Sequence, residues 1–163
     1  MKRQKRQYVR DGRAPIPEKE ITSQIMSAIK GKNTSPEKKL KKALMKLRIN
    51  GLRTHLKTLP GVPDISYPKE KVAIFVNGCF WHRCPKCKLK LPKTHKSYWK
   101  RKFTRNVERD KKNIKLLKKE GWTAKTIWEC EIKKDALKVA ERIDKALAKK
   151  RSRGYNTSIH EKE

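Results

Sequence analysis

The sequence has few acidic residues and no long hydrophobic run. No segment approaches the roughly 20 consecutive apolar residues of a membrane-spanning helix, and none forms a clean amphipathic anchor, so we expect no membrane partner. Only 16 Asp and Glu oppose 46 Lys and Arg, which leaves a formal net charge of +30. A charge of this size favours a polyanionic partner, and nucleic acid is the default because neutralised phosphates release counterions.

Cysteine is scarce too, since the chain of 163 residues contains four. No apolar stretch of a secretory signal follows the basic start "MKRQKRQYVRDGR". We therefore expect a cytoplasmic, reducing location, in which cysteines favour a metal over disulfides. The length fits one domain with a modest core. Composition predicts a basic flexible arm at 1–20, a folded domain at 21–149 and a polar tail at 150–163.

Apolar spacing predicts alternating helices and strands. The strand predicted at 71–77 is nearly all apolar, which is typical of a strand buried on both faces. The order of elements fits a mixed sheet with helices packed on it. The expected elements are a short helix after residue 21, a helix from Ser35 to Gly51, strands at 52–57, 64–67 and 71–77, a helix at about 97–120, a strand at 122–128 and a helix at about 133–149.

Three of these helices carry an apolar face that we expect to be buried. Asp110 falls on such a face, between Val107 and Ile114. An aspartate there must be paired or functional because burying it unpaired is costly, unless burial of the helix ends at that point. The expected faces are Leu40, Ala43, Leu44 and Leu47 in the first helix, Trp99, Phe103, Val107, Ile114 and Leu117 in the second, and Leu137, Ala140, Ile143 and Leu147 in the last.

The four cysteines lie just beyond two predicted strands. Cys79, Cys84 and Cys87 follow the strand at 71–77, and Cys130 follows the strand at 122–128. If these strands are parallel neighbours, their carboxyl ends coincide and the fourth thiolate lies beside the other three. Four soft ligands suit zinc in a closed structural site. Buried free thiols and a redox pair are the alternatives.

Three polar residues are candidates for chemistry. His82 is a spare fifth ligand, and its fixed loop would suit a general base, although a lone loop histidine is more often a surface residue. Asp64 is either an ordinary turn residue or an oxygen ligand for magnesium, on a hairpin that leads to Asn77. Glu37 is adequately explained by the dipole of the helix that it begins.

Two aromatic residues lie on the cysteine-containing loop. Loop aromatics such as Phe80 and Trp81 often bind something, for example a base face, but they could also cover the cysteine site. Trp99 lies on an apolar helix face, so packing is its default role.

Five motifs, in this order and spacing, resemble the very-short-patch-repair (Vsr) endonucleases. The resemblance covers about residues 23–131, and its "GCFWH", "NVERD" and "WEC" pieces are specific together. It implies a restriction-endonuclease-like mixed sheet flanked by helices, with a structural four-cysteine zinc site. The motifs are "MSAIKGKNTSPE", "LPGVPDI", "VAIFVNGCFWH", "LPKTHKSYWKRKFTRNVERD" and "GWTAKTIWEC".

The resemblance also implies an activity. Its members make a magnesium-dependent nick in the thymine strand of a T·G mismatch, which arises when 5-methylcytosine is deaminated. The partner would be double-stranded DNA with a T·G mismatch, in the nucleoid, and a monomer suffices for one nick. In that pattern Asp64 and the backbone carbonyl of Val76 hold magnesium, and His82 is the base that activates water.

The remaining roles follow from the same resemblance. Asp110 would orient and stabilise the base, and Glu37 would hold water near the magnesium or hydrogen-bond the catalytic group. Zinc would be bound by four cysteines. The second of these ligands is a cysteine here, at a position where the family pattern also allows a histidine. The zinc ligands would be Cys79, Cys84, Cys87 and Cys130, and the aromatic wedge into DNA would be Phe80, Trp81 and Trp99, with Met26 opposite.

One position departs from the Vsr pattern. Asn77 stands where "HGCFWH" would have its first histidine. An amide does not exchange a proton near neutral pH, but it can hydrogen-bond a phosphate oxygen. Hydrolysis is still expected, because Asp64 and His82 are present. The rate and the mismatch specificity depend on the role that the replaced histidine has in the other members of the family.

Two other functions fit parts of the sequence. The first is a sequence-specific or mobile-element nuclease on the same scaffold. The second is a zinc-stabilised nucleic-acid-binding protein without activity, for which the high lysine content and the four cysteines would suffice.

Overall fold

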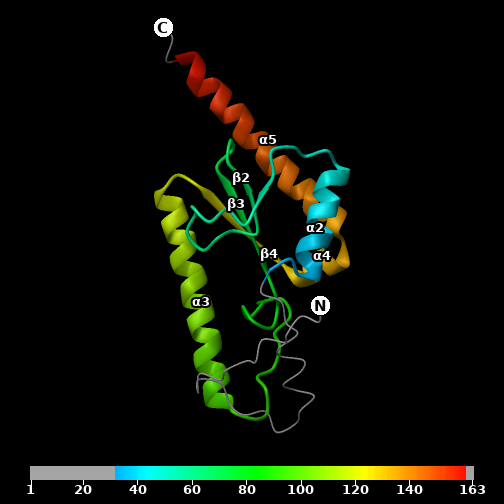
Figure 1. Ribbon diagram of the computed structural model, residues 1–163, viewed down its shortest axis with the longest axis vertical. Coiled ribbons are helices and arrows are strands. Elements are labelled where there is room, and N and C mark those ends of the chain that lie inside the picture. Colours follow the sequence, from blue (N-terminus) through cyan, green and yellow to red (C-terminus); the bar gives the residue numbers. More distant parts are fainter. Residues whose placement is uncertain (1–31, 161–163) are drawn as a thin grey trace, which may run out of the picture.

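Four strands form one mixed sheet with helices on both faces (Figure 1). The computed structural model describes residues 32–160. The sheet has the order β1-β2-β3-β4, in which the first three strands are antiparallel and β3 and β4 are parallel. The expected mixed α/β sheet is confirmed. The strands are β1 (Arg53–Thr54), β2 (Ile65–Tyr67), β3 (Val72–Asn77) and β4 (Thr123–Trp128).

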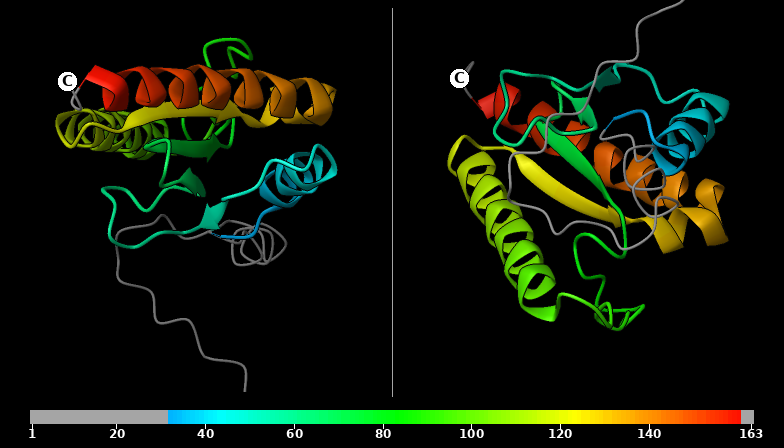
Figure 2. Two further views of the ribbon diagram at one scale, coloured as in Figure 1. Left: turned by 90° about the horizontal axis from the view of Figure 1, so that it is seen from above. Right: turned by 60° about the horizontal axis from the view of Figure 1, so that its bottom comes forward.

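Strand β3 lies at the centre and is buried on both faces, as its apolar sequence predicts. Val72 and Ile74 point into one core cluster, while Ala73 and Phe75 contribute to a second cluster on the other face. This alternation follows from the two-residue period of a strand. The sheet therefore separates two apolar layers, and Figure 2 shows it between α3 on one side and α2, α4 and α5 on the other.

Helix α2 (Ser35–Lys46) begins at the predicted residue, with Thr34 as its N-cap, and buries Leu40, Ala43 and Leu44. Its end differs from the prediction. The helix stops at Lys46 rather than near Gly51, and Leu47 becomes its cap residue. Leu47 therefore leaves the buried face and is 37% exposed, so the prediction that it is buried is wrong.

Helix α3 (Lys96–Lys119) connects β3 to β4 and makes their parallel pairing possible, because such a connection must cross the sheet. It runs over nearly the predicted range. Phe103 and Leu117 are its buried residues, while Trp99, Val107 and Ile114 are partly exposed. Of the predicted stripe, only Phe103 and Leu117 are thus fully buried.

The last predicted helix is two helices, α4 (Glu129–Lys134) and α5 (Ala136–His160). Helix α5 continues past residue 149 and protrudes from the body of the molecule (Figure 1). Ala140, Ile143 and Leu147 are buried as expected, but Leu137 is 37% exposed. The buried stripe begins at Ala136, and the next residue lies about 100° around the helix from it.

The predicted arm and the short helix after residue 21 lie outside the described residues. Within residues 32–160, no helix is long and apolar enough to cross a membrane.

Two leucines of α5 test the position of its buried stripe. Leu147 is fully buried in the larger core cluster, so Leu147→Ala should lower the free energy of unfolding by about 2–5 kcal/mol. The same substitution at Leu137, which is 37% exposed, should cost about 1 kcal/mol or less. Urea unfolding monitored by circular dichroism measures both. Equal losses for the two variants would contradict this packing.

Candidate active site

A cleft of about 750 Å³ lies where the end of β3, the start of α2 and the middle of α3 meet. It brings together every residue for which the sequence suggested a catalytic role. These residues come from four separate segments, and Asn77 is the last residue of β3. The residues brought together in the cleft are Glu37, Asp64, Asn77, His82 and Asp110.

His82 and Asp110 form the closest pair in the cleft. The Nδ1 atom of His82 lies 2.5 Å from Oδ2 of Asp110, and both side chains are about one-fifth to one-quarter exposed, at 21% and 24%. The Nδ2 group of Asn77 donates to the same carboxylate oxygen at 3.5 Å. Asp110 is therefore paired, as an aspartate on an apolar helix face must be. A proton on Nδ1 leaves the lone pair of Nε2 free to accept another.

Asp64 is held against the main chain of β3. The Val76 N–H donates to Oδ2 of Asp64 at 2.7 Å. Burial raises the pKa of Asp64 to about 6, and the nearby Glu37 adds to this, although the Val76 hydrogen bond opposes it. A buried carboxylate with so few compensating partners is a site where a cation is stabilised.

Glu37 is buried and serves the start of α2. Its carboxylate accepts hydrogen bonds from the main-chain N–H groups of Asn33 and Thr34 and from the Thr34 hydroxyl, at 2.8, 3.3 and 2.6 Å. This reciprocal arrangement is a capping box. The sequence explained Glu37 by the helix dipole alone, whereas the structure adds these capping hydrogen bonds, and the same carboxylate also lines the cleft.

His55 belongs to the cleft and was missed by the sequence reasoning. Its Nε2 lies 3.7 Å from Oε2 of Glu37, and its Nδ1 lies 3.9 Å from Oδ1 of Asp64. One donor atom from each of these three residues lies within 4.8 Å of the others, so the group could hold a metal ion. No spacing in the sequence indicated this, because only the pairing of β1 with β2 sets His55 opposite Asp64.

The four cysteines meet beyond the cleft, because β3 and β4 end side by side. The sulfur atoms of all four residues lie within 4.8 Å of one another, namely those of Cys79, Cys84, Cys87 and Cys130. The sulfurs of Cys84 and Cys130 are 3.9 Å apart, close to the separation of about 3.8 Å that tetrahedral Zn–S bonds of about 2.3 Å require. Burial raises the pKa of the Cys79 thiol, which a bound cation would counteract.

Two further polar residues fix the loop that joins the cysteines to the cleft. Glu129 accepts a hydrogen bond from the Cys79 N–H at 3.2 Å, and Asn106 donates from Nδ2 to the Trp81 carbonyl at 3.0 Å. Both residues line the cleft. The loop that carries His82 is thus tied to α4 on one side and to α3 on the other.

The loop aromatics pack on the first part of α3. Phe80 contacts Trp81, Trp99 and Phe103 with ring centroids 5.1, 5.7 and 5.0 Å apart. Arg83 lies over the Phe103 ring at 4.9 Å. Phe80, Trp81 and Trp99 all remain partly exposed, and Trp81 lines the cleft. Met26, the residue expected on the opposite side, lies outside the described residues.

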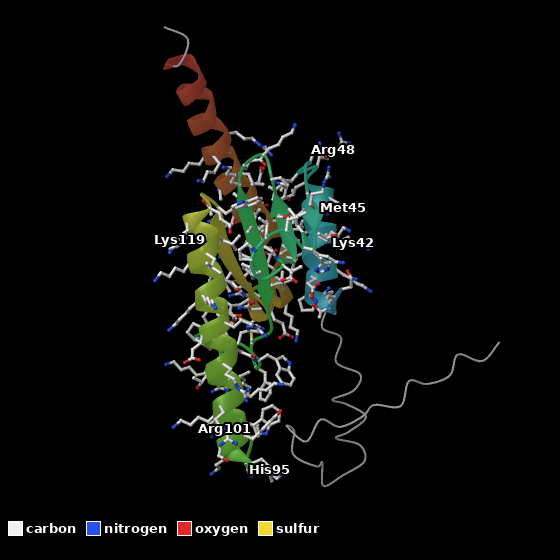
Figure 3. All side chains as sticks on the ribbon, turned by 60° about the vertical axis from the view of Figure 1, so that its left-hand side comes forward. Lys42, Met45, Arg48, His95, Arg101 and Lys119 are labelled. Carbon is white, nitrogen blue, oxygen red and sulfur yellow. The ribbon has the colours of Figure 1, made fainter. Side chains whose placement is uncertain are left out.

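Positive charge surrounds the cleft. Lys32, Lys102 and Arg109 line it. The outer faces of α2 and α3 carry further basic side chains, among them Lys42, Arg101 and Lys119 in Figure 3. Such a surface suits a phosphate backbone.

Comparison with known proteins gives a consistent result. The family model described as DNA mismatch endonuclease Vsr matches residues 15–88. The type II nicking enzyme V.XorIIP of Xanthomonas oryzae is 38% identical over 109 residues, which cover 66% of this chain and 79% of that protein. The type II nicking enzyme V.NaeI of Lentzea aerocolonigenes is 39% identical over 130 residues, covering 77% and 78%.

The DNA mismatch endonuclease Vsr of Escherichia coli is also similar. It is 34% identical over 120 residues, which cover 74% of this chain and 76% of that protein. Two of these relatives are thus named as nicking enzymes and the third as a DNA mismatch endonuclease. The chain therefore belongs to the Vsr family and is a DNA endonuclease.

Proposed function

We propose that this protein nicks the thymine strand of double-stranded DNA at T·G mismatches, in very-short-patch repair of deaminated 5-methylcytosine. One observation carries the proposal: a single basic cleft holds a partly buried Asp64 together with His82, whose ring lies against the Asp110 carboxylate. A carboxylate for a divalent cation and an oriented base are the two parts that hydrolysis of a phosphodiester needs.

Asp64 is the residue that would hold Mg²⁺, with the backbone carbonyl of Val76 as its neighbour. The fit rests on the chemistry of the site, since a hard oxygen donor is largely shielded from solvent and its negative charge is incompletely offset. When bound, the ion supplies positive charge for the phosphate and for the leaving oxygen. Glu37 would hydrogen-bond water at the edge of the same site.

His82 is the proposed general base. With Nδ1 engaged by Asp110, its Nε2 accepts a proton from the attacking water. The Asp110 carboxylate then stabilises the positive imidazolium that forms and keeps the ring in one orientation. In this mechanism His82 takes up the proton, and Asp110 itself is not protonated.

Asn77 has a positioning role in this arrangement. Its amide donates to Asp110, so it helps to fix the acceptor that orients His82. It is 7% exposed, and any contact that it makes with a phosphate oxygen would be as a hydrogen-bond donor rather than as an acid.

Selectivity for a mismatch would come from Phe80, Trp81 and Trp99. Inserting an aromatic wedge costs a few kcal/mol per unstacked step, and a mismatched pair unstacks at lower cost. Phe103 packs against Phe80 and Trp99, and Arg83 in turn lies over the Phe103 ring, so the group is backed by packed side chains, which suits a wedge.

The scaffold is proposed to be restriction-endonuclease-like and stabilised by zinc. Support comes from the mixed sheet with its central β3 and from the four sulfurs at the ends of β3 and β4. Four thiolates around Zn²⁺ leave no open position, so this site would be structural and separate from the cleft.

A comparison of matched and mismatched duplexes tests the proposed substrate. In the presence of Mg²⁺ we expect a single nick in the thymine strand of a T·G duplex, at a rate at least about tenfold above that of the same duplex with T·A, because the wedge opens a mismatch more easily. Denaturing electrophoresis of strands with separate end labels measures this. Equal cutting of both would instead indicate a sequence-specific nuclease, and no cutting of either would indicate a binding protein.

Removal of zinc tests the scaffold. The four thiolates connect the loop after β3 to the start of α4, so dialysis against a chelator should unfold the domain or lower its melting temperature markedly. Re-addition of Zn²⁺, but not of Mg²⁺, should restore it. A chelator-treated, zinc-free protein that melts at an unchanged temperature would rule out the structural zinc site.

A further inference from the structure

His55 occupies a position between two acidic side chains of the cleft. Each of its ring nitrogens faces a different carboxylate, Nε2 toward Glu37 at 3.7 Å and Nδ1 toward Asp64 at 3.9 Å. Both distances exceed those of hydrogen bonds, which lie below about 3.2 Å for N–H···O. The His55 ring therefore forms no hydrogen bond with either carboxylate.

The backbone places the ring there. His55 directly follows β1 and adopts a left-handed conformation with φ of 51°. Its N–H donates to the main-chain carbonyl of Asp64 at 3.4 Å, which continues the pairing of β1 with β2 by one residue. The left-handed turn is uncommon for residues other than glycine, although histidine is among the more tolerant ones.

The three side chains have the composition of a metal site. Their donor atoms all lie within 4.8 Å of one another. Ligands about 2.1 Å from an ion are about 3 Å apart when adjacent and about 4.2 Å apart when opposite, so separations of up to 4.8 Å must shorten before the set surrounds one ion through one nitrogen of His55. Their side chains are only 10–20% exposed, which favours contraction around an ion over separation into solvent.

We propose that His55 is a direct metal ligand and that it gives the site formed by Glu37, His55 and Asp64 a preference for first-row transition ions such as Mn²⁺ over Mg²⁺. The inference rests on the proposed function in taking this cleft as the site of the divalent ion. It adds a nitrogen ligand that the pattern of Asp64 with the Val76 carbonyl does not contain.

The ligand type decides the preference. Mg²⁺ selects oxygen ligands and keeps most of its water, so it gains little from an imidazole. Transition ions accept imidazole readily, and Mn²⁺ tolerates a mixed set of one nitrogen and two carboxylates. The four cysteines do not compete for Mn²⁺ once zinc occupies them, because thiolates are soft ligands.

Metal binding without DNA tests this inference. Zinc-loaded protein is titrated with Mn²⁺, and free Mn²⁺ is followed by electron paramagnetic resonance, with Mg²⁺ as competitor. His55→Asn and His55→Gly should each weaken Mn²⁺ binding by about tenfold or more, the scale of change seen even for residues that only support a ligand. Their affinity for Mg²⁺ should change by less than about threefold.

These variants keep the backbone unstrained, because asparagine and glycine both tolerate the left-handed conformation. His95→Asn is the matched control. His95 has the same φ of 51° but caps the far end of α3, and it should bind Mn²⁺ like the unmodified protein (Figure 3).

The outcomes separate this inference from the proposed function. Unchanged Mn²⁺ affinity in both folded His55 variants, checked by circular dichroism, would overturn the role of His55 as a ligand, even if T·G duplexes are nicked. Loss of Mn²⁺ affinity supports it, even if T·G and T·A duplexes are cut equally and the proposed substrate is wrong.

Discussion

The parallel pairing of β3 with β4 is the constraint on which the rest of the structure depends. Because both strands end at the same edge of the sheet, Cys130 reaches the loop that carries Cys79, Cys84 and Cys87. The same pairing requires a crossover, and α3 provides it. Asp110 lies on that helix and contacts His82 of the loop. The sulfur cluster, the loop that carries His82 and the Asp110 carboxylate beside it are thus consequences of one strand arrangement.

The loop after β3 carries both the cysteines of the sulfur cluster and residues that line the cleft. Its cysteines face one another, while His82 and Trp81 line the cleft. The proposed base His82 must be held in a fixed orientation to act efficiently, and a short loop achieves this only when it is restrained from several sides. Here the restraints are the sulfur cluster, the Glu129 carboxylate and the Asn106 amide. The structural and chemical parts of the loop depend on each other for this reason.

Much of this arrangement could be predicted from the sequence. The cysteines beyond two predicted strands indicated one cluster if those strands were parallel neighbours, and the aspartate on the apolar face of α3 indicated a paired or functional residue unless burial ended there. The remaining features depend on tertiary structure. Leu47 and Leu137 continue apolar patterns, but where a helix stops or starts decides their burial. His55 carries no signal of its own, because its position follows from strand register and a left-handed turn.

In the proposed mechanism, the carboxylate of Asp64 is the group that brings a divalent ion to the DNA. Asp64→Asn removes the charge and keeps the shape and the Val76 hydrogen bond. Asp144→Asn, on α5 and outside the cleft, is the matched control. The most direct measurement is single-turnover nicking of a T·G duplex beside its equilibrium binding. Asp64→Asn should lose nicking by at least about a thousandfold while DNA affinity is kept, as expected for an interaction that acts on the reaction rather than on binding. Nicking by Asp64→Asn at the rate of Asp144→Asn would contradict the account.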